Sequence, residues 1–271
     1  MPDPDTLPDY QFVATPQGDR HALASEVPLA VVLNGVSHAV MMVSPNQLEA
    51  FITGFLLSEG IILHHREIHD LEFECAGDAL EARVTLANGS HYRWREHRRS
   101  LAGRTGCGLC GIESLEQALP ALPALPGQPL PALAAVEALR RQLSDWQPLG
   151  QACGALHAAF YADAEGRIQH SCEDVGRHNA LDKLLGWHHR HALATPGMVL
   201  ITSRCSVELV QKMVRAGLPT LITLAAPTTL AVRQARRLGL NLLHLPRQQG
   251  PRVYSVSLHT ECDHEQEDQS L

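Results

Sequence analysis

The chain has 271 residues, a formal net charge of −7 and 45% hydrophobic residues. This length is sufficient for one or two domains with a sizeable core, and the ordinary apolar fraction indicates a globular protein. The acidic balance argues against general nucleic-acid binding. The arginines that cluster between Arg93 and Arg104 suit a specific anionic ligand or an acidic protein partner instead.

Seven cysteines are scattered along the chain rather than arranged as a framework. Their odd number favours a reducing compartment, with thiol or metal chemistry, over structural disulfides. The first residues, MPDPDTLPDYQ, contain no apolar signal segment, and no run approaches the ~20 apolar residues of a membrane span. We therefore expect a cytoplasmic protein that does not associate with a membrane.

Residues 1–25 are predicted to form a flexible arm, and residues 26–102 a small α+β domain. Ser44 and Pro45 predict the N-cap and the first position of a helix that Gly60 ends. The strands of this domain are expected to form a mostly antiparallel sheet, with Asn34-Gly35 as a hairpin turn between the first two. Their predicted positions are Val27–Leu33, His38–Val43, Ile68–Glu74, Ala82–Leu86 and His91–Arg95.

Residues 103–132 are predicted to hold a cysteine loop and a proline-rich connector. Ile112–Leu119 is expected to form a short helix. The five prolines of Pro120–Pro131 exclude a regular helix, so this segment is predicted to be extended.

Residues 133–258 are predicted to form an α/β domain, and residues 259–271 an acidic, disordered tail. Alternating strands and helices with short links predict a largely parallel sheet covered on both faces, which makes three layers. The strands are expected at Gly154–Ala162, Ile168–Glu173, Met198–Thr202, Thr220–Leu224, Leu240–Leu245 and Arg252–Ser257. The helices are expected at Leu133–Trp146, His178–His188, Val207–Ala216 and Thr229–Leu238.

Cys107 and Cys110 lie three residues apart in a glycine-rich segment that follows an arginine-rich run. Glycine leaves room for a partner to approach both sulfurs, and nearby arginines favour the reactive thiolate. Three chemistries use such a pair: half of a zinc site, a redox dithiol, or a cysteine that carries sulfur as a persulfide. A structural zinc site needs two further ligands, and the chain has no second C-x-x-C. A thioredoxin-like dithiol would start a helix after a strand, which this position between domains fits poorly.

Polar residues follow several predicted strands of the second domain and are candidates for binding an anionic ligand. A strand-to-helix turn can hold phosphate or the edge of a base through its exposed N–H groups. The alternatives are ordinary helix capping with solvated charges, and a solvated hairpin for the last segment. The candidates are Arg177, His178 and Asn179, then Ser203, Arg204 and Ser206, and finally Leu245, Pro246, Arg247, Gln248, Gln249 and Gly250.

The 16 histidines fall mostly in pairs on polar stretches, such as His64-His65 and His188-His189. We interpret these pairs as surface residues. His259, Cys262 and His264 offer metal ligands in a segment that looks unstructured, so the sequence assigns no metal site.

Several stretches of the sequence resemble one family, that of FdhD, the sulfur carrier protein required for formate dehydrogenase activity. The resemblance runs from about Glu26 to Ser257, and its most specific part is Glu173-Asp-Val-Gly-Arg-His-Asn-Ala180. The other matching stretches are Asn34-Gly35, Gly54–Ile62, Gly106–Gly111, Gly154–Ala159, Ala180–Lys183 and Ser203–Lys212.

The resemblance implies a cytidine deaminase-like fold for the C-terminal domain and a homodimer. It also implies that sulfur from a cysteine desulfurase passes to a molybdenum or tungsten bis-pterin guanine dinucleotide cofactor, which is delivered to the catalytic subunit of formate dehydrogenase. Cys107 and Cys110 match the family's cysteine pair, with Cys107 as the persulfide carrier, and Leu245–Gly250 matches the cofactor segment. A GDP-like nucleotide is expected to mimic the cofactor.

The sequence departs from the family where Cys153-Gly154-Ala155 precedes His157, and where Cys205 replaces a small residue. A deaminase-like fold does not imply deamination, since that reaction needs an H-x-E glutamate and a P-C-x-x-C pair, whereas His157 is followed by two alanines. Two other functions remain open: a zinc-dependent nucleotide hydrolase or deaminase, and a cofactor chaperone without covalent chemistry.

Overall fold

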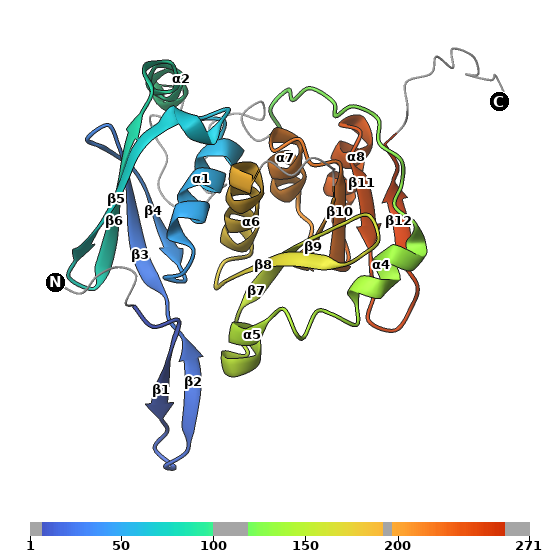
Figure 1. The fold of residues 1–271 in the computed structure, drawn as a ribbon, viewed down its shortest axis with the longest axis horizontal. Helices are drawn as coiled ribbons and strands as arrows, with labels where there is room; N and C mark the ends of the chain where they lie inside the picture. Colours follow the sequence, from blue (N-terminus) through green and yellow to red (C-terminus); the bar gives the residue numbers. More distant parts are fainter. Residues whose placement is uncertain (1–6, 100–118, 192–196, 258–271) are drawn as a thin grey trace.

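The computed structural model describes residues 7–99, 119–191 and 197–257, which form two modules that pack side by side (Figure 1). Cys107, Cys110, the predicted helix Ile112–Leu119 and the predicted tail 259–271 lie wholly or almost wholly outside the described residues. The strands are β1 (Tyr10–Ala14), β2 (Arg20–Ala24), β3 (Val27–Leu33), β4 (Val36–Val43), β5 (Ile68–Ala76), β6 (Ala79–Leu86), β7 (His157–Ala162), β8 (Ile168–Asp174), β9 (Met198–Arg204), β10 (Thr220–Ala225), β11 (Asn241–His244) and β12 (Arg252–Ser255). The helices are α1 (Leu48–Ser58), the 3₁₀ helix η2 (His65–Glu67), α2 (Asn88–Arg99), α4 (Leu133–Leu139), α5 (Pro148–Cys153), α6 (Arg177–His191), α7 (Val207–Arg215) and α8 (Thr229–Arg237).

The N-terminal module is a four-stranded sheet in the order β4-β3-β6-β5, with α1 on its inner face (Figure 1). Leu29, Val31 and Leu33 alternate along β3 and are fully buried, which is the pattern of a strand with one covered face. Asn34 and Gly35 both have positive φ angles, of 47° and 78°, which confirms the predicted hairpin turn.

One predicted helix of this module begins later than predicted, and one predicted strand is wrong. Helix α1 begins at Leu48, with Gln47 as N-cap, because Ser44 is buried and bonded to residues of the C-terminal module. The segment predicted as a strand at His91–Arg95 belongs to helix α2. His91 and Trp94 lie three residues apart with ring centroids 5.5 Å from each other, so a helical period brings both onto one face and buries Trp94.

The predicted N-terminal arm contains regular structure. Strands β1 and β2 pair antiparallel over five residues each and form a hairpin that projects away from the sheets (Figure 1). Most side chains of these strands are exposed, and neither strand has one buried face of alternate residues against a core. The periodicity that reveals a half-buried strand therefore could not reveal this hairpin.

The C-terminal module is built on a six-stranded sheet in the order β12-β11-β10-β9-β7-β8. Strands β9, β10 and β11 are parallel, whereas β7, β8 and β12 join antiparallel. The predicted largely parallel sheet is therefore wrong, and the sheet is mixed. The reason is local, because the tight turn after Ala162 and the short segment after His244 can only link antiparallel neighbours.

Both faces of this sheet are covered, as predicted. Alternate residues of its strands face α6, α7 and α8 on one side, and α4 on the other. Helix α4 ends at Leu139, well before the predicted Trp146. The proline-rich connector has no helix or strand over its described residues, 119–132. Leu125 anchors it, because its N–H donates to the Leu238 carbonyl at 2.9 Å and its side chain packs against the core.

The two modules meet where α1 packs against α6 (Figure 1). Gly54 and Gly186 allow the two backbones to approach closely. A Cβ at Gly54 would lie 1.8 Å from the Asp182 carbonyl oxygen, and one at Gly186 would lie 1.9 Å from the Ala50 carbonyl oxygen. Nearly every residue of α1 is buried, because one side of this helix faces the sheet and the other faces α6.

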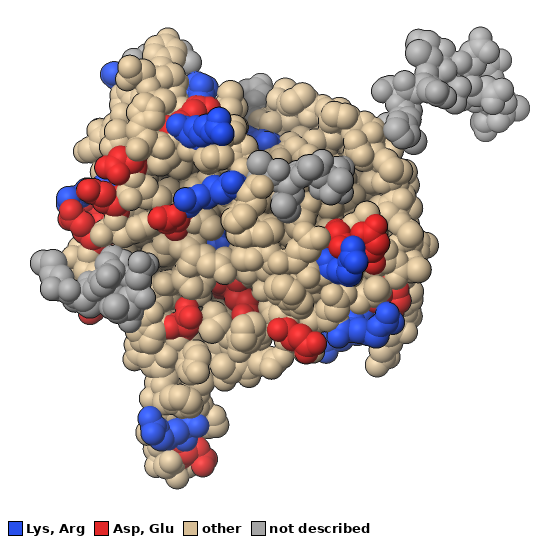
Figure 2. Space-filling view, viewed as in Figure 1, with Lys and Arg blue, Asp and Glu red and all other residues tan. Residues whose placement is uncertain are grey.

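Charged side chains on the face shown in Figure 2 form small groups of mixed sign. One such group lies over β5 and β6, where Arg83 pairs with Glu74 and with Glu81, the latter at 2.7 Å. Within the described ranges, no helix combines the length and the apolar character needed to cross a membrane.

Candidate functional site

The polar segments predicted to bind a ligand all lie at one edge of the six-stranded sheet, which we call the carboxyl edge. Strands β8, β9, β10 and β11 end at this edge, and β7 begins there, since His157 pairs with Asp174. Four strand spacings separate β8 from β11, which is roughly 19 Å. The segments after β8 and after β11 are therefore at opposite ends of the edge, and only a long ligand could contact both.

The turn between β8 and α6 joins the two modules through a buried network that we call the clasp. The Asp174 carboxylate accepts hydrogen bonds from the Ser44 N–H at 3.0 Å and from the Gly176 N–H at 2.8 Å. The Asn179 amide donates to Asp174 at 2.8 Å and to the Met42 carbonyl at 2.7 Å. Both side-chain N–H groups of Asn179 therefore donate within the clasp. Asn179 was predicted to bind the cofactor, and in the structure it connects the two modules.

Lys183 lies at the centre of the clasp, and its side chain is fully buried. Its Nζ pairs with Asp174 at 2.7 Å and donates to the Asn46 side chain at 2.8 Å and to the Ser44 carbonyl at 3.1 Å. Burial lowers the pKa of Lys183, and the charge of Asp174 opposes that shift. Asp174 and the oxygen acceptors around Nζ favour the ammonium form, and their bonds to Lys183 connect the two modules.

A second buried ion pair involves Asp182, the residue before Lys183 on α6. Lys212 of α7 donates to both carboxylate oxygens of Asp182 at 2.8 Å, and Ser58 of α1 donates to the same carboxylate at 2.7 Å. Residues of three helices, α1, α6 and α7, therefore converge on Asp182. The polar residues of the stretch from Glu173 to Lys183 mainly connect the modules.

Arg177 and His178 begin α6 and, unlike their neighbours, are not part of the clasp. Burial, followed by the nearby charges of Lys212 and Arg177, lowers the pKa of His178 to about 4. The pKa of His157, across the edge, is also lowered, first by burial and then by Arg177. Both imidazoles are neutral at pH 7, so each keeps one nitrogen that can accept a hydrogen bond.

The turn between β9 and α7 contains polar atoms without partners. Ser206 occupies the N-cap position of α7, yet its hydroxyl makes no capping bond and is buried without a partner. Glu208, in the first turn, likewise has one buried carboxylate oxygen that is unpaired. Arg204 is exposed beside them, and Ser203 donates to the Arg204 carbonyl at 3.1 Å. Unpaired buried groups are rare, and here they mark a place where a polar ligand would find partners.

The segment after β11, Leu245–Gly250, begins with a residue of the core and continues with exposed residues. Leu245 is fully buried in the core, and its N–H donates to the Thr223 carbonyl at 2.8 Å. Arg140 fixes the rest of the segment by donating to the carbonyls of Pro246 and, at 2.9 Å, Gln249. The side chains from Arg247 onward are exposed. The predicted contact with a ligand therefore concerns Pro246–Gly250, and not the Leu245 side chain.

Residues of the N-terminal module that complete the clasp were missed by sequence reasoning. Ser44 was predicted to be an N-cap, Asn46 carried no signal, and Ser58 was noted only as part of the stretch Gly54–Ile62 that resembles the family. Their partners lie far away in the sequence: Ser44 bonds to Asp174 at a separation of 130 residues. Rules based on residue spacing detect partners that are close in the sequence. No such rule could have identified this network, because its partners are far apart in the sequence.

Comparison with known proteins identifies the family. The model of the FdhD/NarQ family matches residues 24–260. The Sulfur carrier protein FdhD of Bordetella parapertussis is 43% identical over 239 residues, covering 88% of this chain and 87% of the relative. The Sulfur carrier protein FdhD of Chromobacterium violaceum is 45% identical over 239 residues, covering 87% of this chain and 88% of the relative.

A solved structure agrees with this assignment. The crystal structure of a candidate formate dehydrogenase accessory protein from Desulfotalea psychrophila is similar with a TM-score of 0.68 and 26% identity. The similarity covers 91% of this chain and 95% of that one. The chain described here belongs to the FdhD/NarQ family.

Proposed function

We propose that this protein is a sulfur carrier that enables formate dehydrogenase activity. It receives sulfur from a cysteine desulfurase as a persulfide and transfers it to the molybdenum or tungsten bis-pterin guanine dinucleotide cofactor, which it binds and delivers. Membership of the FdhD/NarQ family and the names of the relatives support this role. The observation that carries it is the state of the cysteines that the structure describes.

None of the four described cysteines is exposed. Cys172 is fully buried, donates to the Gln47 side chain at 2.8 Å, and has a pKa raised by burial. Burial also raises the pKa of Cys205 to about 12. The Cys153 thiol donates to the Leu149 carbonyl at 2.9 Å, and Cys75 is packed against the core of the N-terminal module. A carrier must be a thiolate near neutral pH and reachable by a partner. Three cysteines lie outside the described residues, Cys107, Cys110 and Cys262, and the resemblance to the family assigns the role to Cys107 and Cys110.

The transfer needs no oxidant in its first step. The Cys107 thiolate attacks the outer sulfur of the desulfurase persulfide, an S–S bond forms on Cys107, and the desulfurase cysteine leaves as a thiolate. In the second step the Cys110 thiolate attacks the inner sulfur of Cys107. That attack forms a Cys107–Cys110 disulfide and expels hydrosulfide toward the metal of the cargo. A cellular dithiol then reduces the disulfide and restores the pair.

The carboxyl edge would hold the cargo. Its chemistry suits phosphates and a guanine base, because Arg204, Arg177 and the start of α7 offer positive charge and N–H groups. The unpaired hydroxyl of Ser206 fits a phosphate or base acceptor. The remaining ligands would come from Pro246–Gly250, His178 and Ser203, and the roughly 19 Å between the ends of the edge matches an extended dinucleotide better than a small metabolite.

We also propose that the C-terminal module has a cytidine deaminase-like arrangement and that the protein acts as a homodimer in the cytoplasm. The mixed sheet with helices on both faces supports the first point. Deamination is not part of this proposal, because the sequence after His157 lacks the glutamate that this reaction needs.

Mass spectrometry tests the function directly. After incubation with desulfurase and cysteine, the peptide that contains Cys107 should gain one sulfur, about 32 Da. Cys107→Ser should lose this adduct, and cells that carry only this variant should lose formate dehydrogenase activity. Cys75→Ser is the matched control and should keep both. An adduct on Cys75 instead, or full activity with Cys107→Ser, would contradict the proposal.

A further inference from the structure

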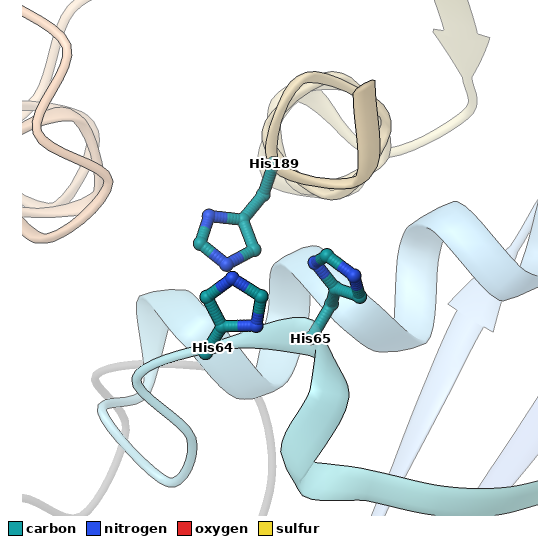
Figure 3. A group of neighbouring side chains, drawn as sticks. All are labelled: His64, His65 and His189. Atoms are coloured by element: carbon teal, nitrogen blue, oxygen red, sulfur yellow. The ribbon is translucent and has the colours of Figure 1, made fainter. Parts of the chain in front are cut away.

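Three histidines from two modules meet beside the junction (Figure 3). His64 and His65 lie in the turn that leads into β5, and His189 lies in the last turns of α6. The ring centroids are 4.3 Å apart for His64 and His65, 4.8 Å for His64 and His189, and 5.3 Å for His65 and His189. One ring nitrogen from each residue lies within 4.8 Å of the other two. Figure 3 shows the rings of His64 and His189 presenting nitrogens to each other.

Two of the three rings each contain a buried nitrogen without a hydrogen-bond partner, while the backbone of His189 also acts as a hydrogen-bond acceptor for the His65 ring. His65 Nδ1 and His189 Nε2 are both buried and unpaired. Burial, and then the neighbouring histidines, lowers the pKa of His189 to about 4, and burial is also the main reason for the lowered pKa of His65. Both rings are neutral at pH 7, and a neutral imidazole with a free nitrogen is the form that binds a metal.

The turn that carries His64 and His65 is held in place by Glu67. One oxygen of this carboxylate accepts hydrogen bonds from the N–H groups of Leu63 and His64, both at 3.1 Å. Its other oxygen accepts from Ser90 and Arg93 of α2. Glu67 is thereby fully engaged and positions the histidines without being a ligand itself. Pre-positioned ligands of this kind are typical of metal sites.

We propose that His64, His65 and His189 bind one Zn²⁺ ion, which connects the N-terminal module to the end of α6. Three imidazole nitrogens with a water as the fourth ligand form a common zinc site, whereas Mg²⁺ and Ca²⁺ prefer oxygen ligands. The inference does not depend on the sulfur carrier role. It uses histidines that the sequence indicated to be surface residues, because nothing in the sequence relates His189 to the pair at His64.

Binding requires two local adjustments. Zinc–nitrogen bonds of about 2.0–2.1 Å demand that the three rings turn inward from their present separation. The Arg66 N–H now donates to His64 Nδ1 at 3.1 Å, so the His64 proton sits on Nε2. Coordination through Nε2 moves this proton to Nδ1 and replaces the bond to Arg66.

The charges around the group do not by themselves attract a cation. Arg66 and Arg190 lie near His65, and both are exposed, while Arg190 pairs with Glu49 at 2.5 Å. Affinity must therefore come from the coordination bonds. We therefore expect the site to bind Zn²⁺ and neighbouring transition-metal ions such as Co²⁺, and not to bind Mg²⁺ measurably.

Titration of the full-length, metal-stripped protein with Zn²⁺ by calorimetry tests the proposal. We expect one site per chain that is weakened at least tenfold in His189→Ala and in His64→Ala, and unchanged in His69→Ala, an exposed histidine on β5. His64 is exposed, so its variant should fold even if His189→Ala does not. Zn²⁺ should also raise the Tm of the wild type and not that of His64→Ala.

Cysteines elsewhere in the chain could also bind zinc, so the ligand type must be measured. With Co²⁺ as a probe, a site of three histidines gives ligand-field bands without a thiolate-to-cobalt charge-transfer band. The tight site should persist in the double variant C107S/C110S. Loss of the site in that variant, equal affinity in His64→Ala and the wild type, or no binding at all would each overturn the proposal.

Discussion

The clasp and the carboxyl edge lie next to each other but differ in how far their buried polar groups are hydrogen-bonded. In the clasp, Asp174, Asn179 and Lys183 are buried and each has several partners. At the carboxyl edge, Ser206 and Glu208 have buried atoms without any partner. A satisfied buried network fixes one arrangement of two modules, whereas an unsatisfied group marks a place for another molecule. The polar residues after β8 therefore mainly maintain the structure, whereas the turn after β9 contains polar atoms without partners.

Removing the Lys183 charge at the centre of the clasp should have the largest effect on stability. Lys183→Met leaves the Asp174 carboxylate buried without its counter-ion, so we expect a loss of about 3–5 kcal/mol in the free energy of unfolding. Urea denaturation followed by circular dichroism measures it. Arg167→Met is the control, because Arg167 is exposed and its bond to Asp163 lies at the surface; no resolved change is expected there. Equal stability of Lys183→Met and the wild type would show that the clasp is not a structural network.

The close approach of α1 and α6 can be tested separately from its charges. Gly186→Ala places a Cβ against the Ala50 carbonyl, and the two helices must separate, which should destabilise the protein by about 1–3 kcal/mol. Gly89→Ala, in α2, has room for its Cβ and should be neutral or slightly stabilising. Thermal unfolding of both variants distinguishes the clash from helix propensity, which favours alanine at both positions.

His178 connects stability to pH. Its pKa falls from 6.5 to about 4 on folding, so the unfolded chain binds more protons between these values, and stability decreases as the pH falls from 6.5 to 4. His178→Gln should remove roughly 1–2 kcal/mol of that decrease, since a pKa unit corresponds to about 1.4 kcal/mol and the ring is partly solvated. Urea midpoints at several pH values measure the slope. An unchanged slope would mean that folding does not lower the pKa of this ring.

The smallest effect should come from the unpaired hydroxyl at the carboxyl edge. Ser206→Ala removes no existing bond, so stability should not fall, but binding of GDP should weaken by about 0.5–1.5 kcal/mol, or about 2–12-fold in Kd. Thr228→Ala is the contrast, because the Thr228 hydroxyl caps α8 by accepting from the Ala231 N–H at 3.2 Å. That variant should lose about 1 kcal/mol of stability. Calorimetry with GDP and thermal unfolding, applied to both variants, separate the two roles.

The sequence by itself determined many of the local elements, and the family. Apolar runs predicted β3 and β9, Asn34-Gly35 predicted its turn, and the prolines of the connector predicted an extended segment without a helix. The family was also within reach, because the stretch from Glu173 to Ala180 is specific. These features depend on neighbours within a few residues, and local sequence patterns report such contacts well.

Only the tertiary structure decided what the polar residues do. Ser44 follows the rules of an N-cap, yet it bonds to Asp174 because packing of α1 against α6 brings the two together. The same packing sets His189 beside His64, and it moves Asn179 from a predicted cofactor ligand to a partner of Met42. A hydrogen bond across a separation of 130 residues depends on how whole helices and sheets dock, and the free energy of docking is spread over many apolar contacts. No local pattern contains that information, so the sequence supplied the chemistry of these residues and the fold supplied their partners.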